Sequence, residues 1–340
     1  MDDGKPGHAV AARRWRRIDV PIRIGVSGCL LGEAIRFDGG HKRSRFVTDE
    51  LGPFVEWVSV CPEVEAGMGI PRPAIRIVQP AGTSEESEQR LVEVKSGRSH
   101  TSVMDRYAKS RVHALAREDL CGYVLKKDSP SCGMTRVRVW SESEQGGATR
   151  DGRGFFARVL EDRMPLLPIE EEGRLEDPLL RERFVTRIFA YRRLKLFFDA
   201  RWTVGELVVF HTEHKMQLLA HSERGYRELG RIVAGARRRP RAEVRDHYSE
   251  TFMRTLATHA TTKRHTNVLQ HMAGHFRGRL DDDSRRELAE TIEDHSAGLL
   301  PLIVPITLIR HHVRRLGVPY LADQIYLDPH PKELMLRNHI

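Results

Sequence analysis

The chain contains few of the residues that would mark a disulfide-bonded or membrane-embedded protein. It has four cysteines in 340 residues, and they show no short paired spacing, which excludes a disulfide framework. No apolar run approaches the ~20 residues that a membrane helix needs. The most apolar stretch, residues 298–309, is short and contains two prolines. We therefore expect a cytoplasmic protein without membrane contact, whose reduced thiols are available for metal binding or catalysis.

We also expect no secretory signal at the amino terminus of this sequence. Four arginines between residues 13 and 17 are followed by no apolar core, so we expect residues 1–21 to form a flexible basic arm. The formal net charge of +9 is compatible with a polyanionic partner, because cationic side chains displace counterions from phosphates. Charge alone does not identify that partner, since many basic proteins bind no nucleic acid.

The first half of the chain alternates short β-branched runs with helical spacing. This alternation predicts an α/β domain over residues 22–175 with a mostly parallel, Rossmann-like sheet. Residues 99–119 have the spacing of a helix, and residues 141–154 are typical of an exposed loop. The expected strands are residues 22–27, 55–60 and 122–125, a hairpin of 76–78 with 91–94, and further strand material at 155–160 and 166–169.

From about Asp177 onward the spacing is helical, and we predict an all-α domain over residues 176–340. The expected helices are residues 178–198, 204–224, 242–259, 264–278, 284–295 and 303–316. Thirteen of the seventeen histidines lie after residue 200. His211 and His214, and likewise His271 and His275, have spacings that metal sites use, but no carboxylate is arranged as in a zinc protease helix. An arginine cluster at residues 237, 238, 239, 241 and 245 is typical of a solvated basic face.

Three of the four cysteines fall at or just after the carboxyl ends of expected strands. Cys29 follows the first strand, Cys61 the second, and Cys132 lies in the turn after residues 122–125. Ligands of open α/β sheets gather at this edge, so the three thiols are expected to converge there. Cys121 precedes its strand among core-like residues, and we expect it to be structural.

Converging thiolates suit more than one cofactor. They could bind zinc together with a fourth ligand or a water. They could equally hold three irons of a four-iron cluster, leaving one iron open to a sulfur-bearing substrate. Glu63 and Ser129 lie close in sequence to Cys61 and Cys132, where they would supply a general acid/base and a hydroxyl donor. Taken singly, Glu63 could face solvent and Ser129 could be a turn former.

Four motifs around these residues resemble the thiouracil desulfidase (TudS-like) domain. They are GVSGCLLG at residues 25–32, RFDG at 36–39, CPE at 61–63 and KKDSPSCG at 126–133. The resemblance implies an α/β domain with a 4Fe-4S cluster on Cys29, Cys61 and Cys132, one iron being without a protein ligand. It also implies catalytic roles for Glu63 and Ser129. The main departure is the polar segment at residues 79–90.

The second half is similar to the helical domain often fused behind that domain. The matching stretches are FHTEHK at 210–215, NVLQH at 267–271, PLI at 301–303, QIYL at 324–327 and LRN at 336–338. The combination resembles the bacterial RudS-type desulfidases, which implies an enzyme that converts 4-thiouridine in tRNA to uridine with release of sulfide. The helical domain would then bind tRNA. Two other hypotheses are a noncatalytic RNA-binding protein with structural zinc, and a thiol enzyme with Cys132 as its nucleophile.

Overall fold

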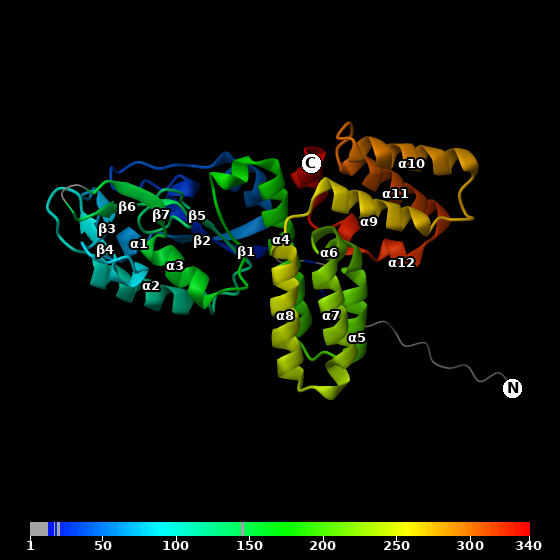
Figure 1. Ribbon diagram of the computed structural model, residues 1–340, viewed down its shortest axis with the longest axis horizontal. Helices are drawn as coiled ribbons and strands as arrows, with labels where there is room; N and C mark the ends of the chain where they lie inside the picture. Colours follow the sequence, from blue (N-terminus) through cyan, green and yellow to red (C-terminus); the bar gives the residue numbers. More distant parts are fainter. Residues whose placement is uncertain (1–12, 17, 19–20, 144–145) are drawn as a thin grey trace.

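The computed structural model describes residues 13–16, 18, 21–143 and 146–340. It has an α/β half and a helical half, with the long helix α4 (Pro178–Phe198) at their junction (Figure 1). The expected fold class is therefore confirmed. Most of the predicted flexible arm lies outside the described residues. Within it, Arg13 and Arg16 form ion pairs with Asp323, and the Trp15 indole donates to Glu213 (2.6 Å).

The central sheet of the α/β half is parallel throughout. Its strand order is β2 (Val55–Val60), β1 (Ile22–Ser27), β5 (Gly122–Leu125) and β8 (Ile169–Glu171). The first three strands have the predicted bounds. Strands covered on both faces carry nearly continuous apolar runs, and IRIGVS and GYVL are such runs.

A second sheet follows the order β4 (Arg90–Glu93), β3 (Ile75–Gln79), β6 (Val137–Ser141) and β7 (Ala148–Gly152). The predicted hairpin is confirmed as the antiparallel pair β3–β4, whose connection contains the polar segment at residues 79–90. The exposed loop expected at residues 141–154 is wrong in part, because β7 pairs antiparallel with β6. The sequence ATRDG of β7 has no apolar alternation, since four of its five residues are exposed.

Helices cover both faces of the central sheet. On one face α2 (Thr101–Leu115) and α3 (Phe155–Arg163) pack against apolar residues of β2 and β5. On the other face lie the first half of α4 and a π-helical turn, Phe46–Leu51. The strand expected at residues 155–160 is wrong, because this segment is the start of α3. Short apolar runs fit a strand and a buried helix equally well.

The helical half consists mainly of consecutive helices joined by short connections. The helix expected over residues 204–224 is wrong as a single element, because the chain breaks at His214 and again at Ser222, whose hydroxyl accepts the N–H of Gly225 (3.1 Å). The helices are α5 (Val204–Glu213), α6 (Lys215–His221), α7 (Glu223–Gly235), α8 (Arg241–Ala257), α9 (Thr262–Gly274), α10 (Asp282–Ser296), α11 (Ile303–Leu316) and α12 (Pro319–Ala322). No helix within the described residues is long and apolar enough to cross a membrane.

Helix α4 contributes to two hydrophobic cores. Its first half, including Phe184 and Ile188, packs with β1, whereas its second half, including Leu194 and Phe197, packs with α5, α7 and α8. The carboxyl-terminal tail returns to the same place, since Leu334 and Leu336 lie in the core that contains β1. Contacts therefore cross the boundary expected near residue 176, and the division into separate domains stays a prediction.

Candidate active site

All five residues that the sequence singled out line one cavity of about 270 Å³. Cys29 lies in the 3-10 turn Gly28–Leu31 directly after β1, and Cys61 directly follows β2. Cys132 lies in the KKDSPSCG turn that follows β5. Glu63 and Ser129 complete the set. The carboxyl ends of three neighbouring parallel strands thus bring together residues that are far apart in sequence.

The KKDSPSCG turn is held in place from two sides. The first N–H groups of α3, at Phe155 and Phe156, donate to the carbonyls of Pro130 (3.0 Å) and Ser131 (2.9 Å). These donors have no partner within their own helix, so the turn satisfies them. From β8, Glu171 Oε1 accepts the N–H of Met134 (2.8 Å). The sulfur of Cys132 is therefore carried by a fixed backbone.

Close packing at this turn also requires a glycine. A Cβ atom added at Gly154 would lie 2.5 Å from the carbonyl oxygen of Ser131, which is too close for any side chain. Gly154 immediately precedes α3 and donates its N–H to Gly133 (2.7 Å). The absent side chain lets α3 approach the cysteine turn.

Ser129 stabilises the turn and also lines the cavity. Its Oγ accepts the N–H groups of Ser131 (3.2 Å) and Cys132 (3.1 Å). A hydroxyl has two acceptor positions and one hydrogen, so both acceptor positions are used and the O–H stays available as a donor. Because Ser129 lines the cavity, that donor can serve a bound molecule.

Glu63 is held by two side chains that sequence reasoning did not identify. Arg72 donates to Glu63 Oε2 from Nε (2.8 Å), and its Nη2 lies 2.7 Å from the same oxygen. The hydroxyl of Ser131 donates to Oε1 (3.1 Å). The guanidinium of Arg72 is itself fixed by the carbonyls of Ile35 and Gly69 (both 3.0 Å). A nearly buried arginine thus holds this carboxylate in one orientation.

The three thiols influence one another. Burial raises the pKa of Cys29 to about 11, and the nearby Cys61 adds to that effect. Burial also raises the pKa of Cys61, and it raises the pKa of Cys132 well above its usual range. Charge on Cys61 and Cys29 pushes the pKa of Cys132 further up, while a hydrogen bond with Ser27 opposes this. The cavity therefore favours thiolates only when a cation lies beside them.

The donor set fits an iron–sulfur cluster. Three soft sulfur ligands line one cavity, and each cysteine of a cluster binds a different iron, so the sulfurs need not converge on one point. Among the described residues, no group of three or more His, Cys, Asp or Glu side chains lies close enough together to hold a single metal ion. The positive charge of bound irons would offset the burial of the thiolates.

The other residues noted in the sequence lie in different surroundings. His214 is fully buried, and its Nδ1 lies 2.7 Å from the carbonyl oxygen of Phe210; burial lowers its pKa to about 3. His211 is buried against the hydroxyl of Tyr248 (3.2 Å), with its pKa lowered by burial to about 4. Cys121 is buried in the core that contains β1, as expected.

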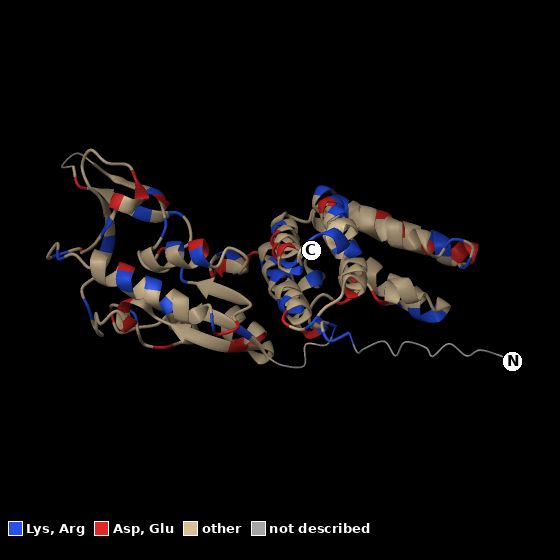
Figure 2. Ribbon diagram, turned by 90° about the horizontal axis from the view of Figure 1, so that it is seen from below, with Lys and Arg blue, Asp and Glu red and all other residues tan. Residues whose placement is uncertain are grey.

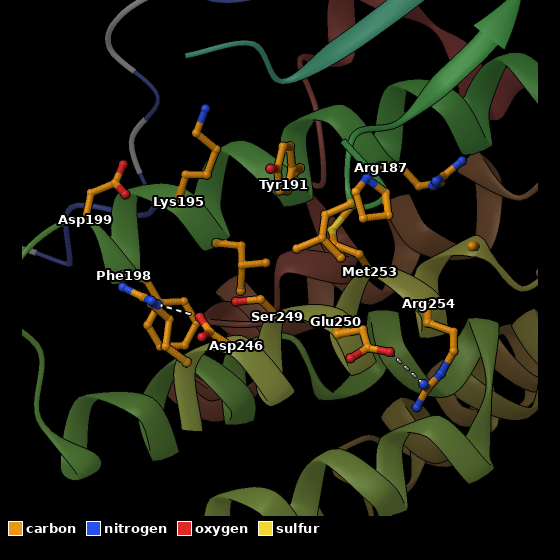
Figure 3. Close-up of a pocket in the computed structure, with 15 residues that line it drawn as sticks. Arg187, Tyr191, Lys195, Phe198, Asp199, Asp246, Ser249, Glu250, Met253 and Arg254 are labelled. Atoms are coloured by element: carbon orange, nitrogen blue, oxygen red, sulfur yellow. Dashed lines mark hydrogen bonds and ion pairs between the residues drawn. The ribbon is translucent and has the colours of Figure 1, made fainter. Parts of the chain in front are cut away.

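A larger hollow of about 1060 Å³ lies elsewhere, between α4, α8 and the loop before β8 (Figure 3). It has no cysteine in its lining, and several of its charged side chains pair with each other. Arg245 pairs with Asp246 (2.8 Å) and Arg254 with Glu250 (3.5 Å). The smaller cavity, and not this one, combines the thiols with a carboxylate and a hydroxyl.

Comparisons with known proteins give two matching families. The 2-thiouracil desulfurase model matches residues 24–172, and a family described as a protein of unknown function, DUF1722, matches residues 215–331. The "Uncharacterized protein YbgA" of Escherichia coli (strain K12) is 34% identical over 155 residues, which cover 45% of this chain and 90% of that protein. A solved structure of the 4Fe-4S-dependent thiouracil desulfidase TudS is 29% identical, covering 46% of this chain and 93% of that chain, with a TM-score of 0.36.

Proposed function

Because the chain belongs to the same family as YbgA of Escherichia coli and carries a 2-thiouracil desulfurase domain over residues 24–172, we propose that it is a tRNA 4-thiouridine desulfidase. In this reaction water replaces the sulfur of the base, so that 4-thiouridine becomes uridine and hydrogen sulfide is released. No net electron transfer is needed. We expect the reaction to take place in the cytoplasm.

One observation carries the proposal: three thiols, an ion-paired carboxylate and a free hydroxyl donor share a single cavity. Its volume of about 270 Å³ lies just below the ~300–1,000 Å³ usual for small-molecule sites. A cavity of this size suits one base better than a longer ligand. Phe37, a residue that is 41% exposed, lines it and offers an aromatic ring on which a base can stack.

Cys29, Cys61 and Cys132 would hold a 4Fe-4S cluster in which one iron has no protein ligand. When bound there, the cluster supplies a soft Lewis acid with an open position for the sulfur of the substrate. This cofactor assignment rests on the sulfur donors of the cavity and on the resemblance of the four motifs described above.

Glu63 would act as the general acid/base, and Ser129 would act as a hydrogen-bond donor. The carboxylate of Glu63 accepts a proton from the attacking water, and it later returns a proton to the departing sulfur. Arg72 and Ser131 hold that carboxylate in one orientation throughout, which makes them positioning residues. The O–H of Ser129 donates to the substrate where negative charge develops.

The helical half, residues 176–340, would bind the tRNA. Figure 2 shows Lys and Arg interspersed with Asp and Glu along the ribbon of both halves. The arginine cluster lies around the connection from α7 to α8, where Arg239 pairs with Glu243 and Arg241 lies over the ring of Trp202. Arg237 and Arg238 form no ion pair with any described residue and would be available to phosphates.

The test is an anaerobic preparation in which iron, sulfide and zinc are measured before the protein meets tRNA that contains 4-thiouridine. We expect about four irons per chain, loss of the 4-thiouridine absorbance, and release of sulfide in equal amount. Zinc without iron or turnover would instead support the RNA-binding hypothesis. Turnover that survives Cys29→Ala would support a thiol enzyme that uses Cys132.

A further inference from the structure

One face of the second sheet is covered by helices. Val137 and Val139 of β6 pack in a small core with residues of α2 and α3. Successive side chains of a strand point to opposite faces, so Arg138 and Trp140 of β6 lie on the other face. In β3, Arg76 lies on this other face as well, because the next residue along the strand lies in the core. The face away from the helices therefore carries arginines and a tryptophan.

The strand register brings three arginines of this face side by side. β3 and β6 run parallel, and their register, continued by one residue, places Arg76 beside Arg138. β6 and β7 run antiparallel, and Arg138 pairs directly with Arg150. Neighbouring strands lie ~4.8 Å apart, so the row of three extends over roughly 10 Å. We call the surface formed by Arg76, Arg138, Arg150 and Trp140 the arginine face.

Acidic side chains balance little of the charge in this row. Arg138 is exposed and forms no ion pair with any residue that the structure describes. The guanidinium of Arg76 lies over the ring of Trp140, 5.4 Å from its centroid, and its Nε has no hydrogen-bond partner among the described residues. Arg150 forms one ion pair, with Asp128 (3.4 Å). Like charges directly opposite each other on neighbouring strands are destabilising, so an anion bound across the row would stabilise it.

The open part of the arginine face lies over β6 and β7. Val78 and Val92, which share this face, are buried, whereas Arg138 and Arg150 are exposed. In Figure 1 the second sheet lies on the side of the α/β half that is away from α4 and the helical half. The exposed arginines are therefore accessible to a large ligand.

We infer that the arginine face binds the ribose–phosphate backbone of an RNA strand. A polynucleotide carries one negative charge per nucleotide, so successive phosphates can pair with successive arginines of the row. The planar guanidinium group matches phosphate with two parallel hydrogen bonds. Trp140 adds an aromatic ring beside the cations, a combination that surfaces for single-stranded nucleic acid use. The inference rests on the proposed function and adds to it a second contact surface for tRNA, on the α/β half.

Arg150 connects the arginine face with the rest of the α/β half. Its partner Asp128 belongs to the KKDSPSCG turn and lines the cysteine cavity. An RNA strand with one base in that cavity can therefore continue over β7 and β6. The arginines of the row would contact nucleotides beyond the one that reacts. They should thus affect the affinity for RNA and not the chemical step.

The first measurement is the binding of fluorophore-labelled, unmodified tRNA to the full chain, followed by fluorescence anisotropy. R138E should weaken binding about tenfold, because an attractive contact becomes a repulsive one. R138A should weaken it less and should lower the slope of log Kd against log salt concentration by about one. The control is R106E, which reverses the charge of an exposed arginine on α2, the helix that packs against the covered face. Equal binding by R138E and R106E would overturn the inference.

Thermal unfolding separates binding from a structural role. Arg138 lies between two arginines, so R138A should leave the melting temperature unchanged or raise it. An arginine that only supports the sheet would give a lower melting temperature when removed. Weaker tRNA binding by R138A together with a clear fall in melting temperature would therefore count against a binding role.

Competition identifies the class of anion. Unlabelled single-stranded RNA should displace the labelled tRNA, and R138E should weaken this competitor as well. Polyglutamate of the same total charge should displace tRNA poorly, because its carboxylates lack the spacing and the bases of RNA. Displacement by polyglutamate at the same concentration as RNA, with the same dependence on Arg138, would identify an acidic protein as the partner and overturn RNA.

Turnover separates this inference from the proposed function. With iron-loaded protein, the ratio of kcat/KM for thiolated tRNA to that for free 4-thiouridine should fall about tenfold in R138E and stay constant in R106E. If neither substrate is desulfurised but tRNA binding still depends on Arg138, the proposed reaction fails and the RNA surface stands. If both substrates react and the ratio is the same in R138E and R106E, the reaction stands and the RNA surface fails.

Discussion

The α/β half places three cysteines around a cavity, whereas the helical half places its most buried histidines inside a packed core. Both residue types bind metals, and the sequence offers suggestive spacings for both. The cysteines follow strands whose ends meet at one edge, so their side chains share open space. His211 lies in α5 and His214 directly follows that helix, and their hydrogen-bond partners are a tyrosine hydroxyl and a main-chain carbonyl. A metal-binding residue type is a possible ligand when its side chain lines a cavity, as at these strand ends, and a core residue when it is packed among apolar side chains. Spacing in the sequence does not distinguish the two cases.

The largest effect is expected when one cysteine of the cavity is removed, because this tests directly whether the cavity thiols are ligands. Cys132→Ala should abolish both iron binding and desulfurisation, because the cluster would lose one of its three protein ligands. Iron and sulfide content with a turnover assay would measure this. Cys121→Ala is the matched control, since that thiol is buried in the core and lines no part of the cavity. A full cluster in the Cys132 variant would disprove the ligand assignment.

Within the cavity, Glu63→Gln should leave the cluster intact and lower kcat by about 10²–10⁴-fold, the usual contribution of a general acid/base. The amide keeps the shape of the side chain but cannot accept a proton. Single-turnover kinetics at equal iron content would measure the effect. Glu56→Gln, an exposed change on β2, should be neutral. Wild-type turnover in the Glu63 variant would exclude this residue from the chemistry.

The buried histidines should make the stability of the helical half sensitive to acid. The folded pKa of His211 is about 4, below its value of about 6.5 in the unfolded chain. The stability that this histidine contributes is therefore complete above pH 6.5 and is lost as the pH falls toward 4, by on the order of 3 kcal/mol. His214 and His221 act in the same direction.

Urea unfolding at pH 7 and pH 5 would test this prediction. Trp15 and Trp202 lie in the core of the helical half, so replacing Trp57 and Trp140 by phenylalanine leaves reporters for that half alone. No buried histidine occurs before residue 211 among the residues that the structure describes, and the α/β half should lose less stability. Equal losses in the two halves would contradict the comparison.

The smallest effect is expected at the arginine cluster. Arg237→Ala with Arg238→Ala should raise KM for thiolated tRNA about threefold and flatten its salt dependence. The same variant should act on 4-thiouridine as the wild type does. Arg224→Ala, an exposed change elsewhere on α7, provides the control. Equal losses on tRNA and nucleoside would show that these arginines support the fold instead.

Much of the fold follows from local patterns. The strands Ile22–Ser27, Val55–Val60 and Gly122–Leu125 and the helices Pro178–Phe198 and Ile303–Leu316 have the predicted bounds, because each is a strong apolar pattern with clear ends. The strand predicted at residues 155–160 was wrong because α3 begins there, and this helix start depends on contacts with a distant part of the chain. Its first N–H groups are satisfied by carbonyls of the cysteine turn, about 25 residues earlier, and the residues of the helix do not show this.

For the candidate site, the positions of the cysteines were predictable from the sequence, whereas the contacts that support Glu63 were not. The rule that ligands gather at the carboxyl edge of a parallel sheet was enough to bring the three cysteines together. Arg72 gave no comparable signal, because its contact with Glu63 depends on how residues 64–71 fold back. Ser131 lay inside a recognised motif, yet its contact with Glu63 joins two different strand ends. The supporting contacts of a site depend on loop paths that periodicity does not describe.

The tail of the chain has a consequence for the order of synthesis. Leu334 and Leu336 lie in one core with Ile22 and Ile24, and Arg337 bonds to the buried Glu182 (3.1 Å). The core around β1 is therefore incomplete until residues 334–336 have been synthesised. Until then the nascent sheet exposes apolar surface, and a prematurely terminated product would keep that surface exposed. Only a chain that includes residues 334–336 can close the core that supports the cysteine edge.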